Sequence, residues 1–278
     1  MKITKIMALL LAVMMIFSLA ACGEANDTNG DATETENKGA VDTVADTEAD
    51  AEAPVGDNVI KMATNAYFPP YEYYDADKII GIDAEIAEKI AEKLGMTLVI
   101  EDMAFDSIIT AVVEGSVDFG MAGMTITDER LESVNFSVSY AKGVQAIVVK
   151  EGSPITTCDD LYAEGATYKV GVQLGTTGDI YCTDDFGEDR VSSYTTGNEA
   201  ILALLGGSVD CVIIDNEPAK AFVAANEGLQ ILDTSYADED YAICVNKENT
   251  DLLAKIDAAI VELIADGTIE SIVNKYIK

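Results

Sequence analysis

Two charged residues follow apolar runs in positions suited to holding the two ends of a dipolar small molecule. The first is Arg130, three residues after Thr127, whose type favours a helix N-cap. A cation in the first turn opposes the helix dipole, so it needs an anionic partner. A carboxylate ligand could meet backbone N–H groups near Gly123 and Thr125, the Thr125 hydroxyl and the guanidinium together. A salt bridge to a neighbouring acidic residue is the alternative.

The second charged residue, Asp215, ends the apolar run that begins at Cys211 and precedes Pro218. An aspartate after three β-branched residues could cap the helix that Pro218 begins. It could also pair with the ammonium group of a ligand. The two roles are compatible.

Two further segments offer polar donors and an apolar wall. Residues 170–178 indicate a strand, a glycine-rich turn and a helix start, and this turn lacks the GxxxxGK[ST] pattern of nucleotide binding. Residues 65–74 carry five aromatic side chains that could line a ligand, although Tyr73 and Tyr74 better suit packing or surface positions. Phe105 adds an aromatic ring from a later strand–helix loop.

Composition excludes several kinds of chemistry. The 278-residue chain has no His, which removes Ser-His-Asp triads and HExxH zinc sites, and it has no CxxC cluster. With 17 Lys+Arg against 50 Asp+Glu, the formal net charge is −33, which argues against nucleic acid as a partner. We expect no cofactor and no metal. Arginine occurs only twice beside 15 lysines, which indicates that guanidinium geometry matters where it is used.

Strand-like and helix-like runs alternate after residue 58, which predicts an α/β fold with parallel-rich sheets covered by helices. Apolar residues recur every four positions from Ile82 to Leu94, with Asp83 as the expected N-cap and Gly95 as the expected stop. A second helical pattern starts at Ile108 and ends at Gly115. The expected strands of this half are 59–64, 96–100 and 117–123.

An internal repeat indicates two similar lobes. Residues 111–123 and 203–215, which are 92 positions apart, both read as a helix end, a Gly-Ser-Val-Asp turn and a strand. Each strand would end at the carboxyl edge of its own sheet, where open α/β sheets place ligands. Two such edges facing each other would form a cleft for a small molecule.

The N-terminus has the pattern of a bacterial lipoprotein leader. Lys2 and Lys5 precede an apolar run that ends Leu19-Ala20-Ala21-Cys22, which resembles a lipobox. The resemblance implies a signal peptide over 1–21 and a diacylglyceryl anchor on Cys22; an ordinary secretory signal with a chance cysteine is the alternative. Residues 22–57 are acidic and have no aromatic residue, so we expect a disordered tether.

Eight segments together resemble the extracytoplasmic solute-binding proteins, family 3, of polar amino-acid ABC transporters. The resemblance covers almost all of 58–278. It implies the type II periplasmic-binding-protein-like fold, in which two open mixed sheets flanked by helices enclose a hinged cleft. Lobe 1 would comprise 58–140 plus 241–278 and lobe 2 would comprise 141–240, with crossings near 140–144 and 236–241. The segments are ATNAYFPPYEY (63–73), GIDAEIAEKIAEKLG (81–95), FDSIITAV (105–112), AGMTITDER (122–130), VNFSVSY (134–140), GVQLGTTGD (171–179), DCVIIDNEPAKAF (210–222) and DGTIESIVNKYI (266–277).

The same resemblance implies a role for each candidate site residue. Arg130 matches the residue that binds the α-carboxylate and Asp215 the one that binds the α-ammonium. The other implied contacts are Gly123 and Thr125 beside the carboxylate, Gln173, Thr176 and Thr177 from lobe 2, and Asn65, Phe68 and Phe105 from lobe 1. The neutral amides at 65 and 173 favour a polar uncharged ligand side chain, but Glu72 and Asp106 would reverse this preference if they point inward.

We therefore expect a non-enzymatic receptor, lipid-anchored at the outer face of the cytoplasmic membrane, that delivers a free amino acid to an ABC transporter permease. The alternatives are a cyclohexadienyl-dehydratase-like enzyme, with Glu72 or Asp215 as general acid, and a ligand-sensing lipoprotein. Cysteines 211 and 244 lie in apolar runs and suit buried thiols. A Cys158–Cys182 disulfide is conceivable, but the sequence assigns none.

Overall fold

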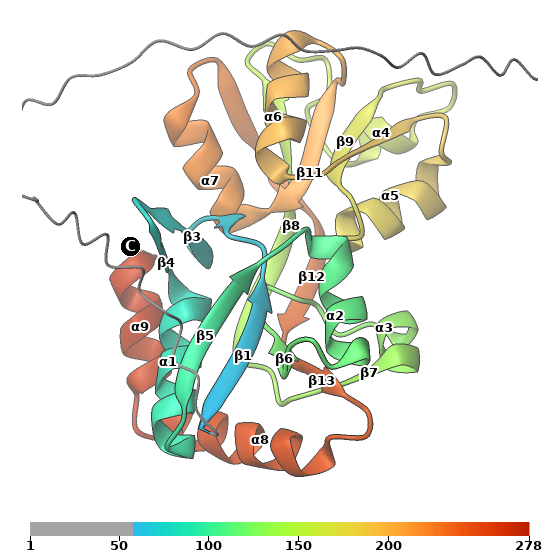
Figure 1. The fold of residues 1–278 in the computed structure, drawn as a ribbon. Helices are drawn as coiled ribbons and strands as arrows, with labels where there is room; N and C mark the ends of the chain where they lie inside the picture. The colour runs from blue at the N-terminus through green and yellow to red at the C-terminus, as the bar shows by residue number, and fades with distance from the viewer. Residues whose placement is uncertain (1–57, 278) are drawn as a thin grey trace, which may run out of the picture. The chain divides into compact units, whose positions relative to one another are not determined.

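The computed structural model describes residues 58–277, which form two five-stranded β-sheets and one small three-stranded sheet, with helices around them (Figure 1). The expected signal peptide, Cys22 and the acidic segment 22–57 lie outside the described residues. Within the part that the structure describes, no helix combines the length and apolar character that a membrane crossing requires.

Sheet 1 is a five-stranded mixed sheet with the order β5-β1-β6-β13-β7. Strand β1 runs parallel to β5 and β6, whereas β13 is antiparallel to β6 and β7. Side chains alternate along β1, so Ile60 and Met62 pack against α1, α8 and α9, while Ala63 packs on the opposite face against α2. The strands are β1 Val59–Thr64, β5 Thr97–Asp102, β6 Phe119–Gly120, β7 Val134–Phe136 and β13 Cys244–Asn246.

The helices beside sheet 1 are α1 Ile82–Leu94, α2 Ile108–Glu114, α3 Asp128–Ser133, α8 Thr250–Ala265 and α9 Thr268–Tyr276, with a 3₁₀ turn at Phe105–Ser107. A small antiparallel sheet follows β1 and consists of β2 Tyr67–Phe68, β3 Glu72–Asp75 and β4 Lys78–Ile80.

Sheet 2 has the order β10-β9-β11-β8-β12, in which β9 is parallel to β10 and β11 while β8 is antiparallel to β11 and β12. Its strands are β8 Ala141–Lys150, β9 Val170–Gln173, β10 Val191–Tyr194, β11 Cys211–Asp215 and β12 Leu229–Tyr241. Its helices are α4 Asp159–Tyr162, α5 Thr177–Phe186, α6 Gly197–Gly206 and α7 Asn216–Ala225.

The repeated Gly-Ser-Val-Asp segments form the same turn beside each sheet. Each preceding helix ends at a left-handed glycine, Gly115 with φ 74° or Gly207 with φ 78°. The aspartate three residues later donates its backbone N–H to a lysine carbonyl and accepts that lysine's N–H at 2.7 Å. The lysines are Lys61 in β1 and Lys169 just before β9. The repeat thus ends a helix and aligns a parallel strand.

Strands β8 and β12 connect the two sheets. Val144 pairs with Asp238 and Ala141 with Tyr241, and the ladder continues to Tyr140, whose N–H donates to the Tyr241 carbonyl at 3.0 Å. Beyond these residues the chain enters sheet 1 through β7 and β13 (Figure 1). The two expected crossing segments are therefore hydrogen-bonded to each other.

Several local expectations need correction. Asp83 is not the N-cap of α1; Gly81 occupies that position with φ 130°, and a Cβ there would lie 2.1 Å from the Tyr71 carbonyl oxygen. The strand expected over 117–123 shrinks to β6, and α7 begins at Asn216 rather than at Pro218. Gly95 does end α1 in the left-handed conformation, as the spacing predicts.

The four cysteines of the described residues are free thiols, so the conceivable Cys158–Cys182 disulfide is not formed. Cys182, Cys211 and Cys244 are buried. Burial raises the pKa of both the Cys211 and Cys244 thiols to about 12, which keeps them protonated and unreactive.

Candidate functional site

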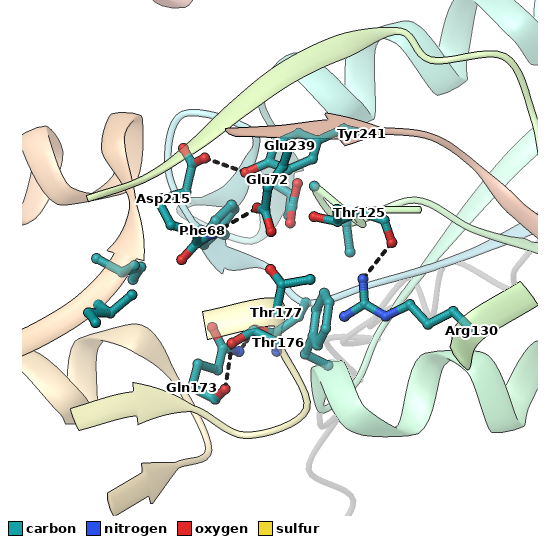
Figure 2. A pocket seen from close by; sticks show the side chains of 17 residues that line it. Phe68, Glu72, Thr125, Arg130, Gln173, Thr176, Thr177, Asp215, Glu239 and Tyr241 are labelled. Carbon is teal, nitrogen blue, oxygen red and sulfur yellow. Dashed lines mark hydrogen bonds between the residues drawn. The ribbon is translucent and has the colours of Figure 1, made fainter. Parts of the chain in front are cut away.

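All ten residues expected to contact a ligand line one pocket (Figure 2). Asn65 follows β1, Gln173 ends β9 and Asp215 ends β11, so the pocket lies at the carboxyl ends of strands from both sheets. This is the location that the open-sheet rule predicts. The other lining residues are Glu72, Ala122, Gln145, Ile213, Ile214, Glu239 and Tyr241.

Arg130 lies in the pocket wall with unused hydrogen-bond donors. Thr127 caps α3 by accepting the Arg130 N–H at 3.2 Å, as expected, and the Arg130 side chain is buried. The guanidinium donates to the Thr125 carbonyl at 2.7 Å and to the Gly175 carbonyl at 3.0 Å. It forms no salt bridge among residues 58–277, so the neighbouring-acid alternative is not realised. Three of its five N–H donors remain for an anion.

Asp215 caps α7 and also lies in the pocket wall. One carboxylate oxygen accepts the Glu217 N–H at 3.1 Å; the other accepts the Val144 N–H at 3.0 Å and the Tyr241 hydroxyl. Burial nevertheless raises the pKa of Asp215 to about 6, because these hydrogen bonds only partly offset the loss of water. An ammonium group beside Asp215 would favour its ionised form.

Two of the three side-chain amides that line the pocket, Asn65 and Gln173, hydrogen-bond to each other. Gln173 Nε2 donates to Asn65 Oδ1 at 2.9 Å and to the Thr195 carbonyl at 3.2 Å. Asn65 Nδ2 donates to the Met103 carbonyl at 2.8 Å. The groups that these two amides leave for a ligand are the amide oxygen of Gln173 and one N–H of Asn65, so part of their capacity to recognise an uncharged polar ligand is already used.

Two carboxyl groups in the pocket have oxygens without a partner. Glu72, at the start of β3, is 1 % exposed and neither of its oxygens accepts a hydrogen bond in the described structure. Glu239, on β12, accepts from Gln145 Nε2 at 2.9 Å through one oxygen, while the other oxygen has no partner. Figure 2 shows both on the side of the pocket where Tyr241 lies, with Arg130 and Gln173 approaching from other directions.

The sequence identified only part of this carboxyl group cluster. Glu72 was recognised as a residue that would matter if it pointed inward, and it does line the pocket. Asp106 does not line the pocket. It packs against Gly175, where an added Cβ would lie 2.9 Å from the Asp106 Cβ. Glu239, Gln145 and Tyr241 were missed, and only the pairing of β8 with β12 brings them to the site.

Asp83 does not line the pocket, but it hydrogen-bonds to Gly123, which does, and to Tyr140. One of its oxygens accepts the Gly123 N–H at 2.8 Å and the Tyr140 hydroxyl at 2.7 Å. Burial raises the pKa of Asp83 to about 6 despite these two hydrogen bonds. Among the described residues, no group of three or more His, Cys, Asp or Glu side chains is arranged to hold a metal ion.

The raised pKa of Asp83 predicts how its replacement changes stability with pH. The Asp83 carboxyl group binds its proton more tightly in the native state than in the unfolded chain. Above pH 6 the native carboxyl group is ionised and destabilises the fold, whereas near pH 4 it is protonated and this cost disappears. Asp83→Asn should therefore gain unfolding free energy relative to the parent as pH rises from 4 to 7, by up to about 3 kcal/mol. Urea unfolding of the ligand-free protein measures this difference. The exposed Glu92→Gln on the same helix is the control, and a flat difference for Asp83→Asn would contradict the prediction.

The comparisons with known proteins agree with this geometry. Residues 60–278 match the family model described as bacterial extracellular solute-binding proteins, family 3. The chain is 33 % identical over 223 residues to the putative ABC transporter arginine-binding protein 2 of Escherichia coli (strain K12), covering 78 % of this chain and 90 % of that protein. The chain therefore belongs to the family 3 solute-binding proteins, as the sequence motifs predicted.

Solved structures of similar proteins have the same fold. An ancestral arginine-binding protein bound to glutamine has a TM-score of 0.74 and 38 % identity, covering 79 % of this chain and 98 % of the other. The arginine-, lysine-, histidine-binding protein ArtJ of Geobacillus stearothermophilus has a TM-score of 0.74 and 33 % identity, covering 79 % and 95 %. The predicted two-lobed α/β fold with open mixed sheets is confirmed. Family membership implies an extracytoplasmic location.

Proposed function

We propose that this protein is an extracytoplasmic receptor that captures a free amino acid between its two lobes and delivers it to an ABC transporter permease. The observation that carries the proposal is that Arg130 and Asp215 line the same pocket, Arg130 from α3 beside sheet 1 and Asp215 from β11 in sheet 2. Arg130 would bind the α-carboxylate with its unused N–H groups, and Asp215 would bind the α-ammonium. A zwitterion that touches both would favour the closed arrangement of the lobes.

The proposed division of the chain follows its sequence pattern. Lobe 1 comprises 58–140 plus 241–278 and lobe 2 comprises 141–240, and the unbroken pairing of 141–145 with 237–241 supports crossings at these boundaries. A signal peptide over 1–21, a lipid on Cys22 and an acidic tether over 22–57 would hold the receptor at the outer face of the membrane.

For the ligand, we propose an amino acid with a cationic side chain, of which L-arginine is the model. The unpartnered oxygens of Glu72 and Glu239 support this class, because a buried carboxyl group is costly unless it is protonated or paired. The mutual pairing of Asn65 and Gln173 weakens the sequence-based preference for an uncharged side chain. The printed names of the E. coli relative and of ArtJ point to the same class.

A panel of free amino acids tests this proposal by isothermal titration calorimetry. L-Arginine should bind with micromolar or tighter affinity. L-Citrulline, which has the same shape without the charge, should bind at least about tenfold more weakly. Tighter binding of citrulline or glutamine would overturn the cationic class and leave the receptor proposal standing. Failure of every amino acid to bind would overturn the receptor proposal itself.

The enzymatic alternative receives less support. Glu72 or Asp215 would have to serve as general acid, and both carboxyl groups lie in the pocket. The relatives reported above are named as binding proteins, so we propose capture without chemical turnover. Family membership likewise favours delivery to a transporter over a purely sensory role.

A further inference from the structure

Glu72 and Asp83 form a buried pair of carboxyl groups in which only one of the four oxygens has hydrogen-bond partners. The Asp83 N–H donates to the Tyr71 carbonyl at 2.9 Å, which places the two acids on adjoining segments of β3 and α1. Three of their four oxygens accept no hydrogen bond from the described protein; the fourth, on Asp83, accepts from Gly123 and Tyr140. When Glu72 is protonated, its carboxyl group can hydrogen-bond to the carboxylate of Asp83.

The surroundings of this pair are strongly acidic. Burial and the negative charge of Asp83 raise the pKa of Glu72 well above its ordinary value. Glu72 lines the pocket whereas Asp83 does not, so Glu72 is the member of the pair that a ligand in the pocket would meet. The other titratable groups that face the pair from the neighbouring elements are Asp215, Glu217, Glu239, Tyr71, Tyr140 and Tyr241, and the cation on the opposite wall is Arg130.

We propose that Glu72 and Asp83 share one proton in the ligand-free protein and that a cationic ligand side chain displaces this proton from Glu72 to the solvent. Capture of a cationic amino acid is then an exchange of one cation for another inside the pocket, whereas capture of a neutral amino acid leaves the proton in place. This inference rests on the proposed function, because it needs an amino acid in the pocket.

The exchange follows from the charge balance of the site. Arg130 and the ligand α-carboxylate compensate each other, as do Asp215 and the α-ammonium. An additional guanidinium meets the Glu72 carboxyl group, whose O–H bond breaks heterolytically so that the proton leaves to water or buffer. No covalent bond to the ligand forms. The carboxylate left behind pairs with the new cation, which is the condition under which a buried charge is tolerated.

Calorimetry of the purified full chain measures this proton directly. L-Arginine and L-citrulline are titrated at pH 7 in phosphate and in Tris, which have different ionisation enthalpies. We expect about one more proton to be released per arginine than per citrulline, because any change at Asp215 is common to both ligands. At pH values where the pair holds its proton, each unit by which the pH is lowered should weaken arginine binding about tenfold more than citrulline binding.

Two variants locate the proton. Glu72→Gln should release no additional proton with arginine and should lose the ligand-dependent pH slope, whereas the exposed Glu92→Gln should behave like the parent. Equal proton counts for arginine and citrulline in the parent would overturn the inference, and so would an undiminished count in Glu72→Gln. The comparison of ligands in the parent stands alone if that variant does not fold. If neither ligand binds, the proposed function fails as well, which is a distinct result.

Discussion

Arg130→Ala is expected to lower the affinity for arginine by about 10²- to 10⁴-fold. A buried guanidinium that forms charge-assisted hydrogen bonds to a carboxylate cannot be removed without leaving that carboxylate unpaired, which costs about 3–5 kcal/mol. Burial already lowers the pKa of Arg130 while nearby Glu239 raises it, so the site holds a desolvated cation that an anion would stabilise. Titration calorimetry with L-arginine measures the loss.

A ligand without the carboxylate separates recognition from structure. Arg130 also donates to the Gly175 carbonyl, so its removal could weaken closure for every ligand. Agmatine is arginine without its carboxylate, and we expect Arg130→Ala to change agmatine affinity only a few-fold. Equal losses for arginine and agmatine would show that Arg130 acts through the Gly175 contact instead.

Arg190 is the matched control because it is the only other arginine of the chain. It donates to the carbonyls of Tyr168 and Leu161, both at 3.0 Å, and its guanidinium lies 4.6 Å from the centre of the Phe186 ring. It does not line the pocket. Arg190→Ala should therefore reduce the stability of the protein and leave ligand affinity unchanged.

Features set by local chemistry were predictable from the sequence. Four-residue spacing and a terminal glycine predicted α1 and its end at Gly95, and side-chain chemistry predicted the cap at Thr127. The repeated turn at Gly115 and Gly207 was also predictable, because a left-handed glycine and an aspartate three residues later act within one short segment. Ten of the seventeen pocket residues followed from the strand ends and from the family motifs.

Features set by long-range pairing were not predictable. Glu239 reaches the pocket because β12 pairs with β8, and that ladder shifts register between Ile231 and Ser235 and again before Ala237. After two such shifts, the alternation of side chains no longer tells which side of a strand faces the site. The hydrogen bond between the neutral amides at 65 and 173 was not predictable for a similar reason, since it joins residues 108 positions apart in the sequence.

Asp83 lies at the start of α1, as the sequence predicted, but it does not cap the helix. An aspartate near a helix start suggests a cap, yet Gly81 takes the cap position because only a residue without Cβ fits beside the Tyr71 carbonyl. The aspartate then lies in the first turn, where it holds Gly123 and Tyr140. Its function therefore depends on two residues distant in sequence.

Asp215→Asn is expected to lower arginine affinity by about 10- to 10³-fold at pH 7, because the ligand ammonium loses its ionised partner. Stability should change much less. Asparagine keeps an acceptor for the Glu217 N–H and is as good a helix cap as aspartate. The substitution also removes a buried carboxylate. The raised pKa of Asp215, about 6, means that its ionised form destabilises the fold at neutral pH, so its removal offsets the loss of the Val144 hydrogen bond.

The pH dependence and a truncated ligand separate these two effects. Near pH 4 the parent Asp215 is protonated, so removing the charge no longer helps and the variant should become less stable relative to the parent. The ligand 5-guanidinopentanoic acid is arginine without its α-ammonium, and its affinity should change only a few-fold in Asp215→Asn. If both ligands lost affinity equally, Asp215 would act only through its hydrogen bonds to Val144 and Tyr241, and the ammonium would have to bind elsewhere in the pocket.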